Sequence, residues 1–279
     1  MPSLDWIRPH SRIDLHLHSS LSDGRLSPEQ LLEECTEAGL DCIALTDHDL
    51  PPALKAGRNV VGKRAIHVIH GVEISGAHED REFHLLVYFP GQMPLSFQKF
   101  CRERAQKRAI RYENARKKLA IPSIPAASDS ARSGQRSLTR FHLAQALVES
   151  KAVPSKSEAF EHYLGRQHGL FPPLDLTFID AIEAARAAGG ICSWAHPSWD
   201  DALAYAPAFV EAGLQGLEAL RPNVKKRLRK RFERLAEQHG LFLTGGSDWH
   251  GWNQNTLGHF FINGEQGRDF LRALQSPTN

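Results

Sequence analysis

The fold is decided by residues 12–46, which read RIDLHLHSSLSDGRLSPEQLLEECTEAGLDCIALT. In the first seven of them, apolar and polar side chains alternate with the period of two that is typical of a β-strand. A helix is predicted next, because Ser27 can serve as its N-cap, Pro28 suits the first turn and Gly39 can end it. Gln30 can complete a capping box with Ser27. The short apolar run that closes the stretch predicts a second strand.

The rest of the chain repeats this alternation of short apolar runs and amphipathic helices. Five further strands are predicted, over residues 67–75, 83–89, 190–196, 216–220 and 241–246. Amphipathic helices are predicted over residues 179–188, 206–212 and 225–239. Apolar strands that alternate with helices indicate parallel strands covered by helices on the outside. We therefore predict an α/β fold built on a seven-stranded (β/α) barrel.

One connection is too long for a barrel loop. About a hundred residues separate Phe89 from Ile191, whereas loops between strands and helices typically have ~2–6 residues. We predict that residues 95–175 form an inserted helical subdomain, and that residues 1–94 and 176–279 form the barrel that carries the active site. Within the insertion, helices are predicted over residues 97–120, 139–150 and 156–164, with a linker over residues 121–137.

The predicted insertion is basic. It holds 15 Lys and Arg against 7 Asp and Glu, a net +8, which leaves −6 for the remainder of a chain whose net charge is +2. A basic cap over an acidic body indicates that an anionic substrate is captured between them. A solvated helix face explains the basic residues of the first inserted helix nearly as well.

Metal-ligating side chains recur at the predicted strand ends. His16 and His18 lie two residues apart in one strand, so both imidazoles can reach the same ion. Seven more candidates lie at or after other predicted strands: Asp23, His48, Glu73, His84, His196, Asp248 and His250. Each histidine alone also fits a surface or core role. Together, at the face where barrel enzymes build their sites, the nine predict a multi-metal centre suited to zinc, manganese or iron(II).

The motifs that contain these residues resemble the PHP (polymerase and histidinol phosphatase) superfamily of metal-dependent phosphoesterases. They are, in chain order, DLHLHSSLSDGRLSPEQL, LTDHD, GVEIS, FHLL, AHP and GGSDWHG. The resemblance implies a distorted seven-stranded barrel with two or three divalent ions, most typically Mn²⁺, with Zn²⁺, Fe²⁺ or Mg²⁺ as alternatives. It assigns one ion to His16, His18, Glu73 and Asp248, a second to Glu73, His84 and His196, and a third to Asp23, His48 and His250.

The predicted insertion narrows the resemblance. Its stretches LTRFHLAQALVE and AFEHYLG are similar to the branch that includes 3′,5′-nucleoside bisphosphate phosphatases and 5′-to-3′ exoribonucleases. In that branch the insertion covers the metals and helps to hold the substrate phosphate. The resemblance implies that Arg140 and His142 contact this phosphate. There are two candidates for the general acid, namely His142 and an ion-bound water.

The expected activity is hydrolysis of nucleotide phosphate esters by a hydroxide that bridges two ions. Expected substrates are 3′,5′-nucleoside bisphosphates, short 5′-phosphorylated RNA, or both. Two alternatives stay open: a histidinol-phosphate-type phosphatase, and a non-catalytic nucleic-acid-binding module with structural metals.

The composition excludes a fibrous or disordered chain, since 41% of residues are hydrophobic and 24% are charged. Its apolar runs last only a few residues, against the ~20 that a membrane span needs, and the N-terminus lacks an apolar signal core. We expect a cytoplasmic protein with no membrane association and no obligate protein partner.

Overall fold

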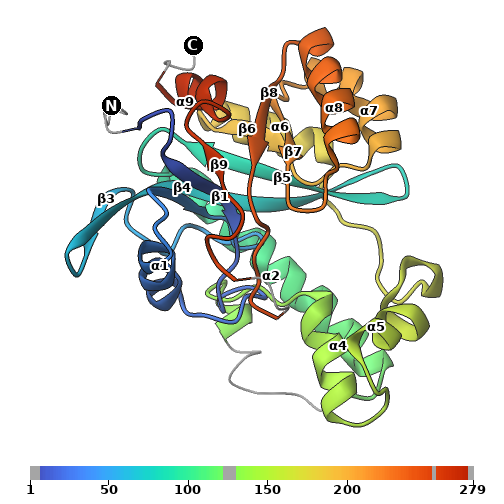
Figure 1. The fold of residues 1–279 in the computed structure, drawn as a ribbon. Coiled ribbons are helices and arrows are strands. Elements are labelled where there is room, and N and C mark those ends of the chain that lie inside the picture. The colour runs from blue at the N-terminus through green and yellow to red at the C-terminus, as the bar shows by residue number, and fades with distance from the viewer. Residues whose placement is uncertain (1–6, 122–129, 253–255, 276–279) are drawn as a thin grey trace.

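The computed structural model of this chain describes residues 7–121, 130–252 and 256–275. One mixed sheet runs through it in the order β8-β7-β6-β5-β4-β2-β1-β9, with β3 paired to β4 (Figure 1). Its strands are β1 (Arg12–Leu17), β2 (Cys42–Leu45), β3 (Gly57–Val61), β4 (Arg64–His78), β5 (Arg81–Phe89), β6 (Ile191–Trp194), β7 (Gly216–Leu220), β8 (Phe242–Gly245) and β9 (Ile262–Asn263).

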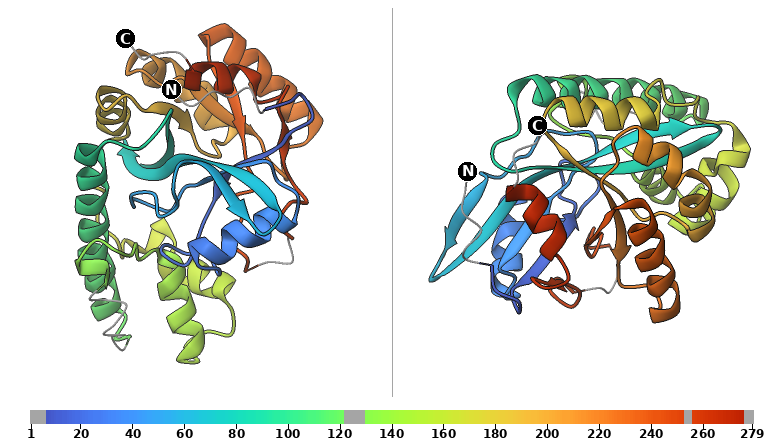
Figure 2. Two further views of the ribbon diagram at one scale, coloured as in Figure 1. Left: turned by 90° about the vertical axis from the view of Figure 1, so that its left-hand side faces the viewer. Right: turned by 90° about the horizontal axis from the view of Figure 1, so that it is seen from above.

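Helices cover the outside of the sheet and extend beyond one end of it. They are α1 (Pro28–Glu37), α2 (Leu95–Lys118), α4 (Arg140–Glu149), α5 (Lys156–Ala159), the π-helix η1 (Phe160–Leu164), the 3₁₀ turn η2 (Arg166–His168), α6 (Phe178–Ala187), α7 (Trp199–Glu211), α8 (Lys226–His239) and α9 (Arg268–Gln275). Further views show α2, in green, running along one side of the molecule (Figure 2).

Helix α1 begins and ends where the sequence predicts. The Ser27 hydroxyl accepts a hydrogen bond from the Gln30 backbone N–H at 3.2 Å, and the Gln30 side chain accepts one from the Ser27 N–H at 3.0 Å. Gly39, just after the helix, has φ 78°, a left-handed conformation that glycine adopts without strain. The strand–helix–strand unit at the N-terminus is therefore set by local sequence signals.

The sheet closes almost into a barrel, because the chain after β8 returns to β1. The Asp248 N–H donates to the His16 carbonyl at 2.9 Å, and the His18 N–H donates to the Trp249 carbonyl at 3.0 Å. These bonds bring the segment after β8 alongside the end of β1. They also place Asp248 next to the paired histidines of β1.

Two expectations about the sheet were wrong. The sheet of the described residues has nine strands rather than seven, because β3 and β9 pair with β4 and β1 respectively. The strands are also not all parallel, since β5 runs antiparallel to both β4 and β6. A tight hairpin causes this reversal: His78 pairs directly with Arg81, and Glu79 in the turn has φ 51°.

The core that holds α6, α7 and α8 to the sheet is aromatic. Each helix buries one phenylalanine completely, namely Phe178, Phe209 and Phe232, and Trp194 of β6 is equally buried. The Phe209 ring lies 4.6 Å from that of Phe178 and 4.8 Å from that of Trp194, between centroids. This packing fixes the outer helices and leaves the opposite end of the sheet for polar side chains.

The described residues of the range 95–175 are largely helical and have a small hydrophobic cluster of their own, which includes Leu143, Leu147 and Leu164. The first turns of α2 instead pack into the sheet's main core through Phe97 and Cys101. Helix α2 thus contributes to both clusters. Most of the predicted linker, residues 122–129, lies outside the described residues.

Among the described helices, none is long and apolar enough to cross a membrane.

Gly246 is required for the closure of the barrel. A Cβ atom there would lie 2.4 Å from the His16 Cβ and 2.5 Å from the His16 backbone nitrogen. We expect Gly246→Ala to lower the free energy of unfolding by about 1–3 kcal/mol, as overpacking does, in urea denaturation. Gly91→Ala is the matched control, since a Cβ there meets nothing within 4 Å. Equal stability of the two variants would contradict this account of the closure.

Candidate metal centre

Glu73 lies at the middle of the candidate site. Its side chain comes from the buried β4 and is 1% exposed. One oxygen, Oε1, lies 3.0 Å from His84 Nδ1 and 3.0 Å from His196 Nε2. The other oxygen, Oε2, faces three imidazole nitrogens at 3.1–3.4 Å, those of His16, His18 and His48. Five histidines therefore surround one carboxylate, which is placed to bridge two ions.

The first group of potential ligands combines His16, His18 and Asp248. Asp248 Oδ1 lies 3.3 Å from both His16 Nε2 and His18 Nε2. Because strand residues two apart share a face, β1 presents both imidazoles to the same point. The three side chains offer ligand atoms within 4.8 Å of one another.

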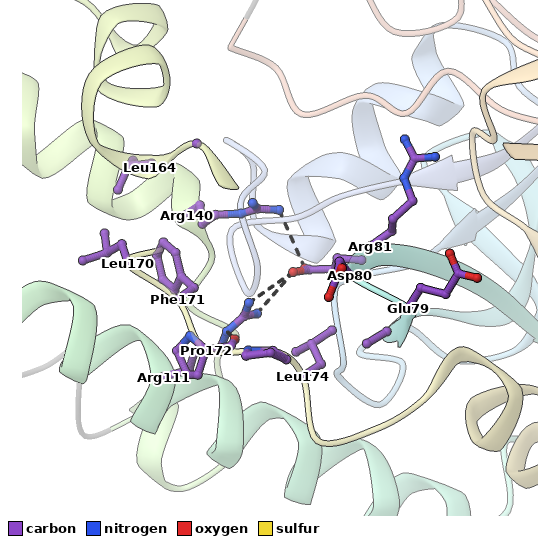
Figure 3. A pocket seen from close by; sticks show the side chains of 14 residues that line it. Glu79, Asp80, Arg81, Arg111, Arg140, Leu164, Leu170, Phe171, Pro172 and Leu174 are labelled. Carbon is purple, nitrogen blue, oxygen red and sulfur yellow. Dashed lines mark hydrogen bonds and ion pairs between the residues drawn. The ribbon is translucent and has the colours of Figure 1, made fainter. Parts of the chain in front are cut away.

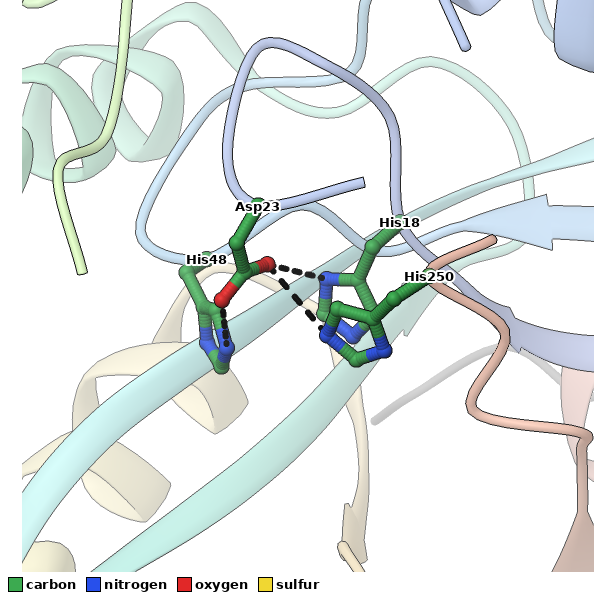
Figure 4. Close-up of side chains that lie close together, drawn as sticks. All are labelled: His18, Asp23, His48 and His250. Atoms are coloured by element: carbon green, nitrogen blue, oxygen red, sulfur yellow. Dashed lines mark ion pairs between the residues drawn. The ribbon is translucent and has the colours of Figure 1, made fainter. Parts of the chain in front are cut away.

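A second group gathers around Asp23 (Figure 4). Asp23 Oδ1 lies 3.7 Å from His18 Nδ1 and 3.3 Å from His250 Nε2, while Oδ2 lies 3.6 Å from His48 Nε2. His250 Nδ1 lies 2.9 Å from the Asp248 carbonyl, which can only accept a hydrogen bond. Its Nδ1 therefore carries the proton and its Nε2 is left to bind an ion.

All nine predicted ligands thus meet at one end of the sheet. The groupings differ slightly from the implied sets: His18 joins Asp23, His48 and His250, and His48 joins Glu73 and His84. His84 reaches this end because β5 is antiparallel. It lies near the start of its strand, as the predicted strand over residues 83–89 also places it, in register with Ser75 close to the end of β4.

The donor set fits divalent cations. Ligand atoms that surround one ion at ~2.0–2.2 Å lie roughly 3–3.5 Å apart, as most of these nitrogens and oxygens do. Within the described residues, Asp23 Oδ1, His48 Nδ1 and His84 Nδ1 are also buried without a hydrogen-bond partner. Buried polar atoms normally have partners, and bound cations would supply them here.

Burial and charge oppose each other in the cluster when no ion is bound. Burial lowers the pKa of His18, but hydrogen bonds to Asp248 and Glu73 outweigh it and raise that pKa to about 10. Burial likewise lowers the pKa of His84, and the Glu73 charge raises it to about 9. Burial raises the pKa of Glu73, but His48 and His84 hold it well below its usual value. The carboxylate is therefore ionised and several histidines hold protons that compete with a metal.

Glu218 orients two of the histidines. Its Oε1 lies 2.8 Å from His16 Nδ1, which directs His16 Nε2 toward Glu73, and its Oε2 accepts the His196 backbone N–H at 2.8 Å. Glu218 is itself fully buried and thus holds both groups behind the candidate ligands. A carboxylate behind a ligating imidazole fixes its tautomer.

Sequence reasoning missed the acids that flank His48. Asp47 accepts hydrogen bonds from the Ser19 N–H at 2.8 Å and the Ser22 hydroxyl at 2.5 Å, which shapes the loop that carries Asp23. Asp49 accepts from Arg108 Nε of α2 at 2.9 Å. A signal was available in the sequence, because one aspartate directly precedes the predicted ligand His48 and another directly follows it.

The backbone is strained at the same place. His196 has φ 33° and Asp248 has φ 53°, values that non-glycine residues rarely adopt. Such conformations persist only where the surrounding structure enforces them, and they concentrate at functional sites. Here the strain turns two predicted ligands toward Glu73.

The two predicted phosphate contacts lie at the start of α4. Arg140 faces Glu82 Oε1 at 3.8 Å, and the same carboxylate oxygen lies 3.7 Å from His84 Nε2. His142 Nδ1 accepts the Thr139 N–H at 3.0 Å in the capping box of α4. Burial lowers the pKa of His142 to about 4, so its imidazole is neutral near pH 7. A cavity of about 330 Å³ is lined by Arg140, His84 and His196 together.

Comparisons with known proteins show the family of the chain. The PHP domain family matches residues 14–113. The 5′-3′ exoribonuclease of Haemophilus influenzae is 33% identical over 86% of this chain and 92% of its own. The 3′,5′-nucleoside bisphosphate phosphatase of Chromobacterium violaceum is 29% identical over 89% and 91%. A Bifidobacterium adolescentis structure described as a metal-dependent phosphoesterase has a TM-score of 0.75 at 24% identity over 98% of each chain, which shows the shared fold alone.

Replacing Glu218 tests whether this carboxylate positions the predicted metal ligands. Glu218→Gln keeps the shape but removes the charge that orients His16, so we expect divalent-ion affinity to fall by roughly 10–100-fold in calorimetric titration with Mn²⁺. The control is Glu211→Gln, at the exposed end of α7. Unchanged affinity in Glu218→Gln would mean that the carboxylate does not position the site.

The pH dependence of metal binding follows from the raised histidine pKa values. Ligating imidazoles must be neutral, so binding has to displace the protons held by His18 and His84 at neutral pH. Because their pKa values without metal are about 10 and about 9, affinity should rise with pH through this range and protons should be released at pH 7. Calorimetry in buffers of different ionisation enthalpy measures the release, and buffer-independent heats would contradict the prediction.

Proposed function

Because the chain belongs to the PHP family of hydrolases that act on phosphoester bonds, we propose that it hydrolyses phosphate esters of nucleotides or short oligonucleotides with two or three bound divalent ions. The observation that carries this proposal is the convergence of nine ligand side chains on the buried Glu73 carboxylate. A merely structural site is closed by about four ligands. This centre offers nine candidate ligands and opens into a cavity of about 330 Å³.

The proposed ligand assignment follows from the groups of side chains. Glu73 would bridge two ions through its two oxygens, one beside His84 and His196 and the other beside His16, His18 and Asp248. Asp23, with His48 and His250, would hold a third. Bound divalent ions supply Lewis-acid stabilisation of the phosphoryl oxygens and lower the pKa of a coordinated water to ~7. The imidazole and carboxylate donors fit Mn²⁺, with Zn²⁺, Fe²⁺ or Mg²⁺ as alternatives.

The charge of the centre favours a phosphate ester. Asp23, Glu73 and Asp248 provide three negative charges against the four or six positive charges of two or three divalent ions. The remaining positive charge attracts an anionic substrate and does not attract a neutral one. The basic segment of residues 95–175 adds to this field, and we assign it as a cap inserted between barrel residues 1–94 and 176–279.

Two cap residues would hold the substrate phosphate. Arg140 can pair with two phosphate oxygens through its planar guanidinium, and it lines the same cavity as His84 and His196. His142 keeps its proton on Nε2, because Nδ1 accepts the Thr139 N–H. The imidazole also hydrogen-bonds the Ser22 backbone, so a bound phosphate would compete for this proton, and the neutral imidazole would not supply it to the leaving group.

The relatives favour a nucleotide substrate over histidinol phosphate. Proteins at about 30% identity over most of the chain are named as an exoribonuclease and a nucleoside bisphosphate phosphatase. The non-catalytic alternative receives no support, since the chain belongs to a family of hydrolases.

Phosphate release with Mn²⁺ tests the proposal. We expect inorganic phosphate from 3′,5′-adenosine bisphosphate, or mononucleotides from 5′-phosphorylated oligoribonucleotides. Asp248→Asn should reduce turnover by more than about 100-fold, because even partners behind the ligands cost 10–100-fold, while substrate affinity falls far less. Asp200→Asn, at an exposed position of α7, is the control.

Two outcomes would overturn the proposal. The first is that neither nucleotide substrate is cleaved; turnover of histidinol phosphate alone would then establish the alternative. The second is that Asp248→Asn retains full activity, which would remove the metal centre from catalysis.

A further inference from the structure

A second cavity adjoins the metal centre (Figure 3). It measures about 140 Å³ and shares Arg81, Glu82 and Arg140 with the larger cavity that contains His84 and His196. Together the two reach the ~300–1,000 Å³ that is usual for small-molecule sites. Because the two cavities share these three side chains, they are neighbours, and a ligand held at the candidate metal centre has the smaller cavity next to it.

The charges that line the smaller cavity balance in number. Its six charged side chains are three arginines and three acids, Arg81, Arg111, Arg140, Glu79, Asp80 and Glu82. Arg111 directs both terminal nitrogens at Glu82 Oε2, each at 3.3 Å, and Arg140 faces the same carboxylate. This balance gives no net attraction for a second phosphate. It does leave donors and acceptors side by side, as a heterocyclic base requires.

One wall of the same cavity is apolar and aromatic. Leu164, Leu170 and Phe171 extend toward it from the helical segment, opposite Glu79 and Arg81 of the β4–β5 hairpin. The Arg111 guanidinium lies over the Phe171 ring, 5.2 Å from its centroid. A flat aromatic face backed by a planar cation is a surface on which nucleobases stack, because every base has a π-face.

The next cavity along α2 is basic. It measures about 260 Å³, shares Arg111 with the Phe171 cavity, and is lined by Arg104, Lys107 and Arg108 against Asp49 and Asp175. Three adjoining cavities thus suit a phosphate at the metals, a neutral group beside Phe171 and an anion beyond it. This is the order of groups along a nucleotide chain.

We propose that the cavity beside Phe171 is the nucleoside subsite, where the base and ribose of the substrate lie while its phosphate ester is at the metals. The proposal rests on the proposed function and names the part of the substrate that this cavity recognises. Phe171 would act in base stacking alone, since it lies outside the group of metal ligands. Specificity for nucleotides over other phosphate esters would then come from this wall.

The test compares two substrates that differ only in the base. With 3′,5′-adenosine bisphosphate, Phe171→Ala should raise KM by roughly 10–100-fold, the range expected for loss of one base–aromatic stack, with kcat little changed. With the abasic 3,5-bisphosphate of 1-deoxyribose, the same variant should leave KM unchanged. Phe171→Tyr should retain wild-type KM, and the control is Phe160→Ala, at an exposed phenylalanine of η1 outside the cavity.

The outcomes separate this inference from the proposed function. If wild type cleaves both substrates and Phe171→Ala changes their KM values equally, or changes neither, the nucleoside subsite is wrong although the phosphoesterase stands. If wild type cleaves neither, the proposed function fails. The subsite is then judged by equilibrium dialysis with adenosine: binding lost in Phe171→Ala and kept in Phe171→Tyr supports it, and no Phe171-dependent binding overturns it.

Discussion

The whole arrangement depends on one buried carboxylate. Glu73 is 1% exposed and has five imidazoles within 3.0–3.4 Å. A charge withdrawn from water at this depth costs several kcal/mol unless opposite charge compensates it. Protons on the histidines provide this compensation when no metal is present, and bound divalent cations would provide it more completely. The side chains that surround Glu73 must therefore come from several parts of the fold, each with an imidazole nitrogen directed at the carboxylate.

The sheet achieves this by bringing the C-terminal ends of parallel strands and the start of an antiparallel strand to one place. The parallel strands β1 and β2 place predicted ligands at or just after their C-terminal ends, β4 places Glu73 five residues before its last residue, and the antiparallel β5 places His84 near its start. The return of the chain after β8 to β1 adds Asp248 and His250 at the cost of strained backbone. Helix α2 is attached to this region through the Arg108–Asp49 pair, and Asp49 directly follows the predicted ligand His48. The helical segment is thus tied to the same residues that form the centre.

Much of this could be predicted from the sequence where the signals were local. The β1–α1–β2 unit follows from alternation, a capping box and a terminal glycine, and the nine candidate ligands follow from motifs at strand ends. The direction of β5 could not be predicted, because a two-residue hairpin turn lies hidden in a polar stretch that reads equally well as a loop. The short β3 was missed although it pairs with the adjacent β4 across a two-residue turn, Val61 opposite Arg64, because its sequence GRNVV carries only two large apolar side chains. The two-residue β9 was missed because it pairs with β1, which is far away in the chain. Glu82 was missed for the same reason: its partners Arg111 and Arg140 lie on two separate helices.

The central claim is that Glu73 bridges clustered divalent ions, and anomalous diffraction tests it most directly. Crystals grown with Mn²⁺ and measured at the manganese absorption edge locate each ion independently of any assay. The account predicts at least two anomalous peaks on either side of the Glu73 carboxylate, each at ~2.0–2.6 Å from its ligand atoms. A map with no peak at Glu73, in crystals that show manganese elsewhere on the protein, would contradict it.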